Sequence, residues 1–444
     1  MIRKILDECK FIFDILESNG YECFAVGGCV RDVLLGNIPN DIDFTTNALP
    51  EEILSCFKEY KTFELGRKFG TISVLNNNQI YEITTYRIDG EYTDSRHPDK
   101  VEFSRNLEDD LLRRDFTINA MAMDRDGNIT DYYGGLNDLC NRKIKAVGNP
   151  YDRFREDALR IFRAIRFSAK LGFDIEPETA TACFCLADTL RNVHPQRIRD
   201  EFSALVLAQN AEKVIEKYRD IIYVIIPEIK PTFDFQQITA HHRYDVFTHT
   251  IKALSLSPED LEIRLALLFH DIAKPACHFT DKAGISHFKG HPSESAKIAE
   301  EILRRFSYPS ALIEKVCLLI KYHDRRFEKL RPHIKKILAT IGEDGFEKLL
   351  IIQKCDALGQ SEYLREEKLK LIESVRTELK NIISESACIK LSDLDINGND
   401  LINLGFSGRE IGKTLDYLLQ EVIYDRLDNN KDELIKTAVS FKEN

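Results

Sequence analysis

The pattern of apolar and polar residues changes character near residue 150. Before that point, short runs rich in β-branched and aromatic residues are separated by helical stretches such as Glu51–Lys58. These runs predict strands over Tyr21–Val26, Asp41–Thr45, Thr71–Leu75 and Tyr81–Tyr86. From Tyr151 onward the apolar residues recur at helical spacing. The predicted fold class is therefore α+β, with an N-terminal head that holds a small mixed sheet and helices, followed by all-α neck, body and tail domains.

The first predicted strand runs directly into two glycines and the start of a helix. In the stretch FAVGGCVRD, Gly27 and Gly28 allow backbone N–H groups to approach an anion without interference from a Cβ atom. A helix beginning near Val30 would direct its positive end to the same place, and Arg31 adds a cation beside it. These features suit a bound phosphate group.

The next stretch, NDIDFTT, carries two carboxylates. Asp41 and Asp43 are two residues apart in a predicted strand, so their side chains share one face. A D-x-D pair by itself is most often a solvated loop. Following a Gly-Gly turn and an arginine, however, the pair suits Mg²⁺ and a triphosphate, because hard cations take oxygen ligands.

A helical segment over 154–173 separates its charges from its apolar residues. Asp157, Arg160 and Arg163 lie on the arc opposite the apolar face. The residues of that face are Ala158, Ile161, Phe162, Ile165 and Ala169. A solvated stripe with ion pairs along the helix is the simplest explanation of these charges, so the pattern alone does not assign them a function.

Composition narrows the class of protein. With 444 residues, 43% of them hydrophobic and 30% charged, the chain is expected to form two to four globular domains. The net charge of −11 excludes a uniformly basic nucleic-acid binder, so RNA would meet local basic patches. Eleven scattered cysteines lack zinc spacing, and no run is long enough to span a bilayer. The N-terminus is typical of a surface helix, which favours a cytoplasmic protein.

Three motifs carry a resemblance to a known family. FAVGGCVRD with NDIDFTT, RRDFTINAMA over 113–122, and EDALRIFRAIRF over 156–167 together resemble the class II tRNA nucleotidyltransferases and bacterial poly(A) polymerases of the polymerase β superfamily. The resemblance implies that Asp41 and Asp43 are catalytic and hold Mg²⁺, with Glu82 as a looser third carboxylate. It also implies that nucleotide is bound by Gly28, Arg31, Arg114, Asp157, Arg160, Arg163 and Arg166.

In this family, Asp157 and Arg160 would act as a protein template for the incoming base. A carboxylate accepts from cytosine N4 or adenine N6, and a guanidinium donates to the neighbouring acceptors, so U and G would leave groups unpaired. In the second motif, Asp115 and Asn119 can hydrogen-bond a ribose or loop backbone. The implied activity is addition of CCA to tRNA from CTP and ATP by a monomer or homodimer.

Two related activities remain as alternatives. The polar stretch over 87–103 has the length of the flexible loop that accompanies complete CCA addition in the family, whereas CC-adding enzymes have it shortened. The segment GRKFGTISV argues against a poly(A) polymerase, because it lacks the arginine-rich continuation that is expected in bacterial poly(A) polymerases.

A second set of chemical residues lies in the helical half. His249, the adjacent pair His270–Asp271 and Asp356 match the H…HD…D core of HD-family phosphohydrolases, with the additional candidates His287, His291 and His323. Imidazole and carboxylate ligands suit a transition metal. The resemblance allows phosphatase or 2′,3′-cyclic phosphodiesterase activity, or a purely structural domain. A remaining alternative is therefore an HD hydrolase with a degenerate, RNA-binding head.

The motifs and the prolines near residue 230 divide the chain into four predicted domains. They are a nucleotidyltransferase head over 1–148, a helical neck for base recognition over 149–232, an HD domain over 233–365 and a helical tail for tRNA binding over 366–444. In the neck, the basic segment HPQRIRDEF from His194 would face RNA or solvent.

Overall fold

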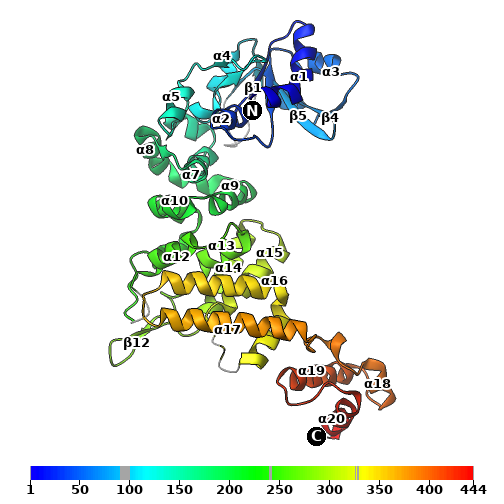
Figure 1. Cartoon of the computed structure of the whole chain (residues 1–444). Coiled ribbons are helices and arrows are strands. Elements are labelled where there is room, and N and C mark those ends of the chain that lie inside the picture. Colours follow the sequence, from blue (N-terminus) through cyan, green and yellow to red (C-terminus); the bar gives the residue numbers. More distant parts are fainter. Residues whose placement is uncertain (1, 91–100, 240–242, 326, 328–329, 444) are drawn as a thin grey trace. The chain divides into compact units, whose positions relative to one another are not determined.

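The computed structural model describes residues 2–90, 101–239, 243–325, 327 and 330–443. The chain divides into two compact units, Met1–Pro227 and Glu228–Asn444 (Figure 1). The finer division into four domains remains a prediction. Within the described ranges, no helix combines the length and the apolar character needed to cross a membrane.

A mixed sheet forms the centre of the N-terminal half of the first unit. The strand order is β3-β4-β5-β2-β1-β8-β9, in which β2 and β5 pair in parallel and the other neighbours are antiparallel. The strands are β1 (Cys23–Val26), β2 (Asp43–Thr46), β3 (Lys61–Phe63), β4 (Thr71–Asn76), β5 (Gln79–Thr85), β8 (Ala122–Met123) and β9 (Ile129–Thr130). The predicted α+β head with a small mixed sheet is confirmed.

All four strands predicted from the sequence are present, with one change that affects the site. Strand β2 begins at Asp43, so Asp41 lies before the strand and not within it as predicted. The strands β3, β8 and β9 were not predicted, because two or three residues are too few to show an alternating pattern.

One face of the sheet is covered by the first helix. Phe13 of α1 (Ile2–Ser18) lies edge-on against Phe44 of β2, with ring centroids 5.4 Å apart, and both side chains are buried. The other helices of this part are α2 (Gly28–Leu34), α3 (Pro50–Cys56), α4 (Leu107–Leu112) and α5 (Gly135–Cys140). Burial of this aromatic pair fixes β2, and with it Asp43, relative to α1.

The polar stretch over 87–103 is partly described. Its ends pair as an antiparallel hairpin of β6 (Arg87–Asp89) and β7 (Val101–Phe103). The predicted flexible loop falls mainly on residues 91–100, which lie outside the described residues.

Helices complete the first unit. They are α6 (Pro150–Glu156), α7 (Leu159–Leu171), α8 (Pro177–Cys185), α9 (Pro195–Leu207), α10 (Ala211–Lys217) and α11 (Arg219–Ile225), and two short strands pair in parallel, β10 (Lys143–Ile144) with β11 (Asp174–Ile175). All five residues of the predicted apolar face in this region are buried. The prediction of one continuous helix over 154–173 is wrong, because the chain is extended at Asp157 with φ −141° and ψ 103°.

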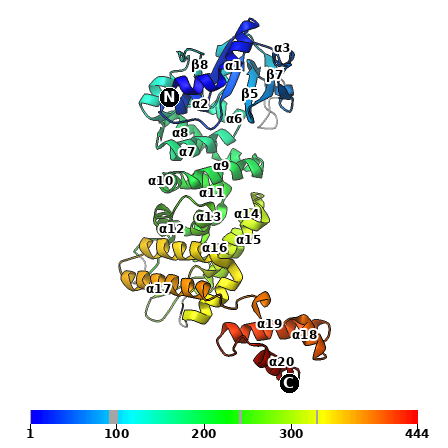
Figure 2. The same ribbon diagram turned by 45° about the vertical axis from the view of Figure 1, so that its right-hand side comes forward.

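The second unit is almost entirely helical. Its helices are α12 (Val246–Ser255), α13 (Leu261–Phe269), α14 (His291–Arg305), α15 (Ser310–Tyr322), α16 (Leu330–Gly359), α17 (Arg365–Ser384), α18 (Gly398–Asn403), α19 (Arg409–Ile423) and α20 (Lys431–Glu443), with one hairpin of β12 (Phe279–Thr280) and β13 (Ser286–His287). The long helices α16 and α17 lie side by side in both views (Figures 1 and 2). A separate apolar core, including Leu401, Leu418 and Leu434, joins α18, α19 and α20.

Candidate active site

One cavity of about 610 Å³ in the first unit brings the predicted nucleotide and metal residues together. All nine of them line it: Gly28, Arg31, Asp41, Asp43, Arg114, Asp157, Arg160, Arg163 and Arg166. Its wall comes from five segments: the β1–α2 turn, the start of β2 with Asp41 just before it, the segment after α4, the α6–α7 break with α7, and the start of α9. The lining residues extend from Gly27 to Arg197 in the sequence. No single motif could predict that segments so far apart form one cavity.

The glycine turn is shaped to admit an arginine. Gly27 has φ 80° and ψ −135°, and a Cβ atom there would stand 2.9 Å from Nη1 of Arg114. Gly28 begins α2, as the predicted anion cradle requires. Arg31 is 3% exposed and donates to Asp32 at 2.8 Å and to Asn119 at 2.6 Å. Asn119 therefore orients Arg31. Asp115 accepts the backbone N–H of Phe116 at 2.8 Å, and contact of either residue with a ribose remains a prediction.

A buried carboxylate orients the arginine pair of the second motif. Asp110, in the first turn of α4, is fully buried; it accepts from Arg113 at 2.6 and 2.9 Å and from Arg114 at 3.1 Å. Burial would raise the pKa of this carboxyl, but the two guanidiniums lower it below its ordinary value. Sequence reasoning missed Asp110, although its spacing of three and four residues from the arginines is a helical ion-pair signal.

Asp157 and Arg160 lie at the junction of α6 and α7. The Asp157 carboxylate accepts the N–H of Leu159 at 3.1 Å, a local bond that competes with helix continuation. It also accepts from Arg197 of α9 at 2.6 and 3.2 Å. Arg197 of the basic segment from His194 thus lines the cavity, whereas His194, Gln196 and Asp200 are exposed, so contact of this segment with RNA remains a prediction.

The Arg160 guanidinium is fixed by three acceptors. Its Nη1 donates to Glu156 at 2.6 Å and to the carbonyl of Arg153 at 3.1 Å, and its Nη2 donates to the carbonyl of Arg113 at 3.0 Å. Because guanidinium has five N–H groups, two remain beyond these bonds among the described residues. The residue is 8% exposed. Its orientation is therefore set before any ligand arrives.

Two further arginines of α7 share an acid on α9. Glu201 accepts from Arg163 at 3.4 Å and forms a short ion pair with Arg166. Arg163 also donates to Asp115 at 2.7 and 2.9 Å. Burial would raise the pKa of the Asp115 carboxyl, but the Arg163 charge, hydrogen bonds from Asn119 and Arg163, and the nearby Arg160 lower it to about 2. Phe167 lies beneath Arg166, whose Cζ is 3.9 Å from the ring centroid.

The two predicted catalytic carboxylates, Asp41 and Asp43, both line the cavity. Within the described residues, neither Asp41 nor Asp43 forms an ion pair, and both are exposed. The pKa of the Asp43 carboxyl is raised, chiefly by desolvation and further by the charges of Glu82 and Asp41. The Arg114 charge lowers this pKa but does not cancel the increase. Glu82 is the strand partner of Asp43 in β5. In the described part of the chain, the three acids do not converge as one set of ligand atoms within 4.8 Å.

In the second unit the four predicted HD residues also come together. Nε2 of His249 lies 2.8 Å from Oδ1 of Asp356, and Nε2 of His270 lies 3.2 Å from Oδ2 of Asp271. Burial would lower the pKa of His270, but Asp271 and Asp356 raise it to about 10. This electrostatic arrangement favours a positive charge among these side chains.

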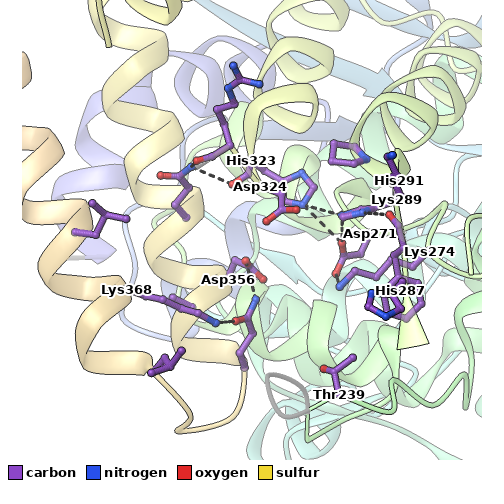
Figure 3. A pocket seen from close by; sticks show the side chains of 18 of the residues that line it. Thr239, Asp271, Lys274, His287, Lys289, His291, His323, Asp324, Asp356 and Lys368 are labelled. Atoms are coloured by element: carbon purple, nitrogen blue, oxygen red, sulfur yellow. Dashed lines mark hydrogen bonds and ion pairs between the residues drawn. The ribbon is translucent and has the colours of Figure 1, made fainter. Parts of the chain in front are cut away.

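The three additional histidines separate into two kinds. His291 and His323 approach Asp271 and are buried (Figure 3). His287 is bound instead to Asp281 at 2.8 Å in the β12–β13 hairpin, so the structure does not support it as a ligand of this cluster. The sequence could not distinguish them, because all three follow the HD pair within a short span.

The low pKa of Asp115 predicts a pH-dependent contribution to stability. A carboxyl whose pKa is lowered on folding stabilises the protein above its unfolded pKa of about 3.9, and loses that contribution as the pH falls toward 2. We expect Asp115→Asn to lower the free energy of unfolding by about 2 kcal/mol at pH 7. Urea unfolding at pH 7, 4 and 3 measures the free energy of unfolding of the wild-type protein and of Asp115→Asn. The difference between these two free energies should become smaller as the pH falls, and a constant difference would contradict this account.

Three family models match the chain. One described as the poly A polymerase head domain matches residues 23–145, and one described as a probable RNA and SrmB-binding site of polymerase A matches residues 172–232. A model described as a putative domain 2 of tRNA nucleotidyltransferases matches residues 290–438.

Complete proteins give the same result. The CCA-adding enzyme of Oceanobacillus iheyensis is 35% identical over 93% of this chain and 91% of its own length. That of Ligilactobacillus salivarius is 31% identical over 100% of this chain and 99% of its own. The crystal structure of the Bacillus stearothermophilus CCA-adding enzyme in complex with CTP has a TM-score of 0.71 at 26% identity, covering 99% of this chain and 98% of that one. The predicted resemblance is thereby confirmed, and the chain belongs to the family of CCA-adding enzymes, which are template-independent tRNA nucleotidyltransferases.

Proposed function

We propose that the cavity of the first unit binds CTP and then ATP and adds CCA to the 3′ end of a tRNA, releasing pyrophosphate. One observation supports the assignment to this cavity. Nine residues from four separate segments, all predicted from the sequence to bind nucleotide or metal, line the same space of about 610 Å³. A similar enzyme of solved structure holds CTP. CC addition and poly(A) synthesis are the alternatives that product length would reveal.

Nucleotidyltransferases of this family use divalent metal ions, and we assign Mg²⁺ to Asp41 and Asp43. The donor set fits, because two carboxylates without ion pairs among the described residues supply the oxygen ligands that a hard cation takes. When bound there, Mg²⁺ would neutralise triphosphate charge and lower the pKa of the tRNA 3′-hydroxyl.

The arginines would hold the triphosphate in line for attack. Arg31 and Arg114 stand beside the Gly27–Gly28 turn, and the Asn119 and Asp110 contacts already fix their orientation. The 3′-hydroxyl oxygen of tRNA bonds to the α-phosphorus, and the bond to the bridging oxygen of pyrophosphate breaks. Positioning and charge stabilisation suffice for this reaction, so no covalent intermediate with the enzyme is needed.

Base selection would rest on Asp157 and Arg160. The carboxylate is an acceptor and the guanidinium has two N–H groups beyond its three protein bonds, the pattern that pairs with cytosine or adenine. Uracil and guanine present the opposite pattern and would leave buried groups unpaired. The ion pair with Arg197 orients the Asp157 carboxylate, so Arg197 is a positioning residue for base choice.

The second unit favours a further activity, metal-dependent hydrolysis of phosphate esters. The supporting observation is that His249, His270, Asp271 and Asp356 meet beside a separate cavity of about 860 Å³. Imidazole and carboxylate donors suit a transition metal, which would activate water. The two activities would use different residues in different units.

The two sites can be separated by matched charge-removing variants. We expect Asp43→Asn to reduce nucleotide addition by about three orders of magnitude, because charge stabilisation at the transferred phosphoryl group is lost, while any phosphate-ester hydrolysis is kept. Asp271→Asn should do the reverse. The assay extends tRNA transcripts that lack CCA, lack only A, or are complete, with each nucleotide alone and with CTP plus ATP.

The wild-type protein should extend the first transcript by CCA and then stop. Growth by CC alone would indicate a CC-adding enzyme, and continued addition of A a poly(A) polymerase. Normal addition by Asp43→Asn would contradict the metal assignment.

Base selection gives a second prediction. In Asp157→Asn, an amide N–H replaces one acceptor, so discrimination of CTP against UTP should fall by about tenfold or more, the scale of one bidentate contact. Arg197→Ala should weaken discrimination in the same direction. Arg199→Ala, on the same helix but paired with Asp200, is the control. Single-nucleotide incorporation with each triphosphate measures the ratio, and equal discrimination in Arg197→Ala and Arg199→Ala would refute the positioning role.

The glycine turn gives a third prediction. We expect Gly27→Ala to weaken CTP binding by about tenfold, or about 1.4 kcal/mol, because the new methyl group displaces Arg114. Gly36→Ala is a matched control, since Gly36 has φ 81° but nothing within 4 Å of the added Cβ. Calorimetric titration with CTP compares the two, and an equal loss in both would mean that backbone strain alone is responsible.

A further inference from the structure

One aromatic ring in the lining of the first-unit cavity has guanidinium groups from two helices over it. The ring belongs to Phe167 of α7. The Cζ atoms of Arg166, Arg31 and Arg163 lie 3.9, 5.0 and 5.4 Å from its centroid. All three distances are within the range of about 6 Å in which the negative face of an aromatic ring attracts a cation. The ring is therefore a common contact of three arginines that line the cavity.

The contact with Arg31 depends on the tertiary fold. Arg163 and Arg166 belong to the same helix as Phe167, so local structure is enough to bring them near the ring. Arg31 belongs to α2, far earlier in the chain, and reaches the ring only because α2 and α7 meet at this cavity. The ring thus joins the arginine beside the glycine turn to the two arginines of α7.

The ring is held in place by protein contacts alone. Phe167 is 4% exposed, and its ring lies edge-to-face with that of Phe116, with centroids 5.8 Å apart and an angle of 82° between the planes. Phe116 is fully buried and directly follows Asp115, the carboxylate that accepts from Arg163. One segment therefore holds both the ring and one of the guanidiniums that contact it.

A ring attracts guanidiniums without cancelling their charge. A carboxylate in the place of the ring would neutralise one positive charge, whereas the quadrupole of a neutral ring leaves all three charges available to an anion. Because the ring is nearly inaccessible to water, each attraction is stronger than it would be on the protein surface. The ring thus offsets part of the repulsion among like charges and keeps the cationic character that a triphosphate requires.

We propose that Phe167 is a positioning residue for triphosphate binding. Its ring sets the spacing of the three guanidiniums, so that they meet the phosphate oxygens together. The inference rests on the nucleotide-binding function proposed for this cavity and adds an uncharged residue to it. Phe167 then affects recognition of the phosphates and not the choice of base, because the pair proposed to select the base is held by other contacts.

Stepwise fluorination of the ring tests this role in the full chain. Each fluorine atom draws electron density from the ring face and weakens its attraction for cations, while the shape of the ring is nearly kept. Phe167 is replaced by phenylalanine that carries one, two or three fluorine atoms. Calorimetric titration should show the affinities for CTP and ATP falling together at each step, by about tenfold in total, the scale of one shielded cation–π contact. The affinity for CMP should fall by a smaller factor, because CMP has a single phosphate.

The same series at Phe162 is the matched control. Phe162 lies on the same helix, is fully buried and packs against Phe202, with ring centroids 6.4 Å apart. No cation lies over its ring in the part of the chain that the structure describes. Fluorination there should leave the affinities for CTP and ATP unchanged. Thermal unfolding of each protein verifies that the fold is kept.

Base choice gives a second measurement. Phe167→Leu removes the ring and keeps an apolar side chain, so it should raise KM for CTP and for ATP by similar factors. The ratio of CTP to UTP incorporation should stay at the wild-type value. A fall in that ratio would place Phe167 in base selection and overturn the proposal.

The remaining outcomes separate the two levels of the inference. Constant CTP affinity across the Phe167 series, or an equal fall in the Phe162 series, would overturn the positioning role and leave the proposed function standing. A wild-type protein that binds neither triphosphate and extends no tRNA transcript would overturn both.

Discussion

The first unit depends on holding seven like-charged guanidiniums around one small cavity. Each of the lining arginines has a carboxylate partner: Asp32 for Arg31, Asp110 for Arg113 and Arg114, Glu156 for Arg160, Asp115 and Glu201 for Arg163, Glu201 for Arg166, and Asp157 for Arg197. Without these partners, burial of several positive charges at close range would be strongly unfavourable. Of these partner acids, Asp115 and Asp157 line the cavity, whereas Asp32, Asp110, Glu156 and Glu201 do not, so the seven arginines outnumber the acids on its lining. The binding site and the stability of this unit therefore rest on the same ion pairs.

The break between α6 and α7 shows how a local conformation serves that arrangement. A continuous helix would place Asp157 and Arg160 on one solvent-facing stripe, each free to change rotamer. The extended backbone at Asp157 instead lets its carboxylate bind both the N–H of Leu159 and the Arg197 guanidinium. Arg160 lies in the first turn of α7 and donates to Glu156 and to the carbonyl of Arg113. Two side chains that would read a base are thus fixed by contacts to three segments, which limits the reorganisation needed when a nucleotide binds.

The two candidate metal sites differ in a way that follows from their burial. Asp41 and Asp43 are exposed residues of the cavity lining, so a cation could enter and leave with each triphosphate. Asp271 and its histidines are buried, and backbone carbonyls fix the orientation of three imidazoles. Such second contacts determine which nitrogen is available to a metal and hold it there. The first arrangement suits exchange with substrate, and the second suits a resident ion.

The sequence by itself determined the α+β head, the helical remainder, the family and the identity of the nine cavity residues. These follow from local patterns: alternation in strands of four or more residues, helical spacing, and motifs whose members are near neighbours in the chain. The tertiary structure decided how those residues are held. Glu201 and Arg197 carry no distinctive motif, and their roles arise only because folding brings α7 and α9 together. Asp110 has the local spacing of a helical ion pair with Arg113 and Arg114, but only the tertiary structure shows that its carboxylate is fully buried. The tertiary structure also decided the approach of His291 and His323 to Asp271 and the exclusion of His287, since helices distant in sequence supply the ligands and only their packing sets which nitrogen atoms meet.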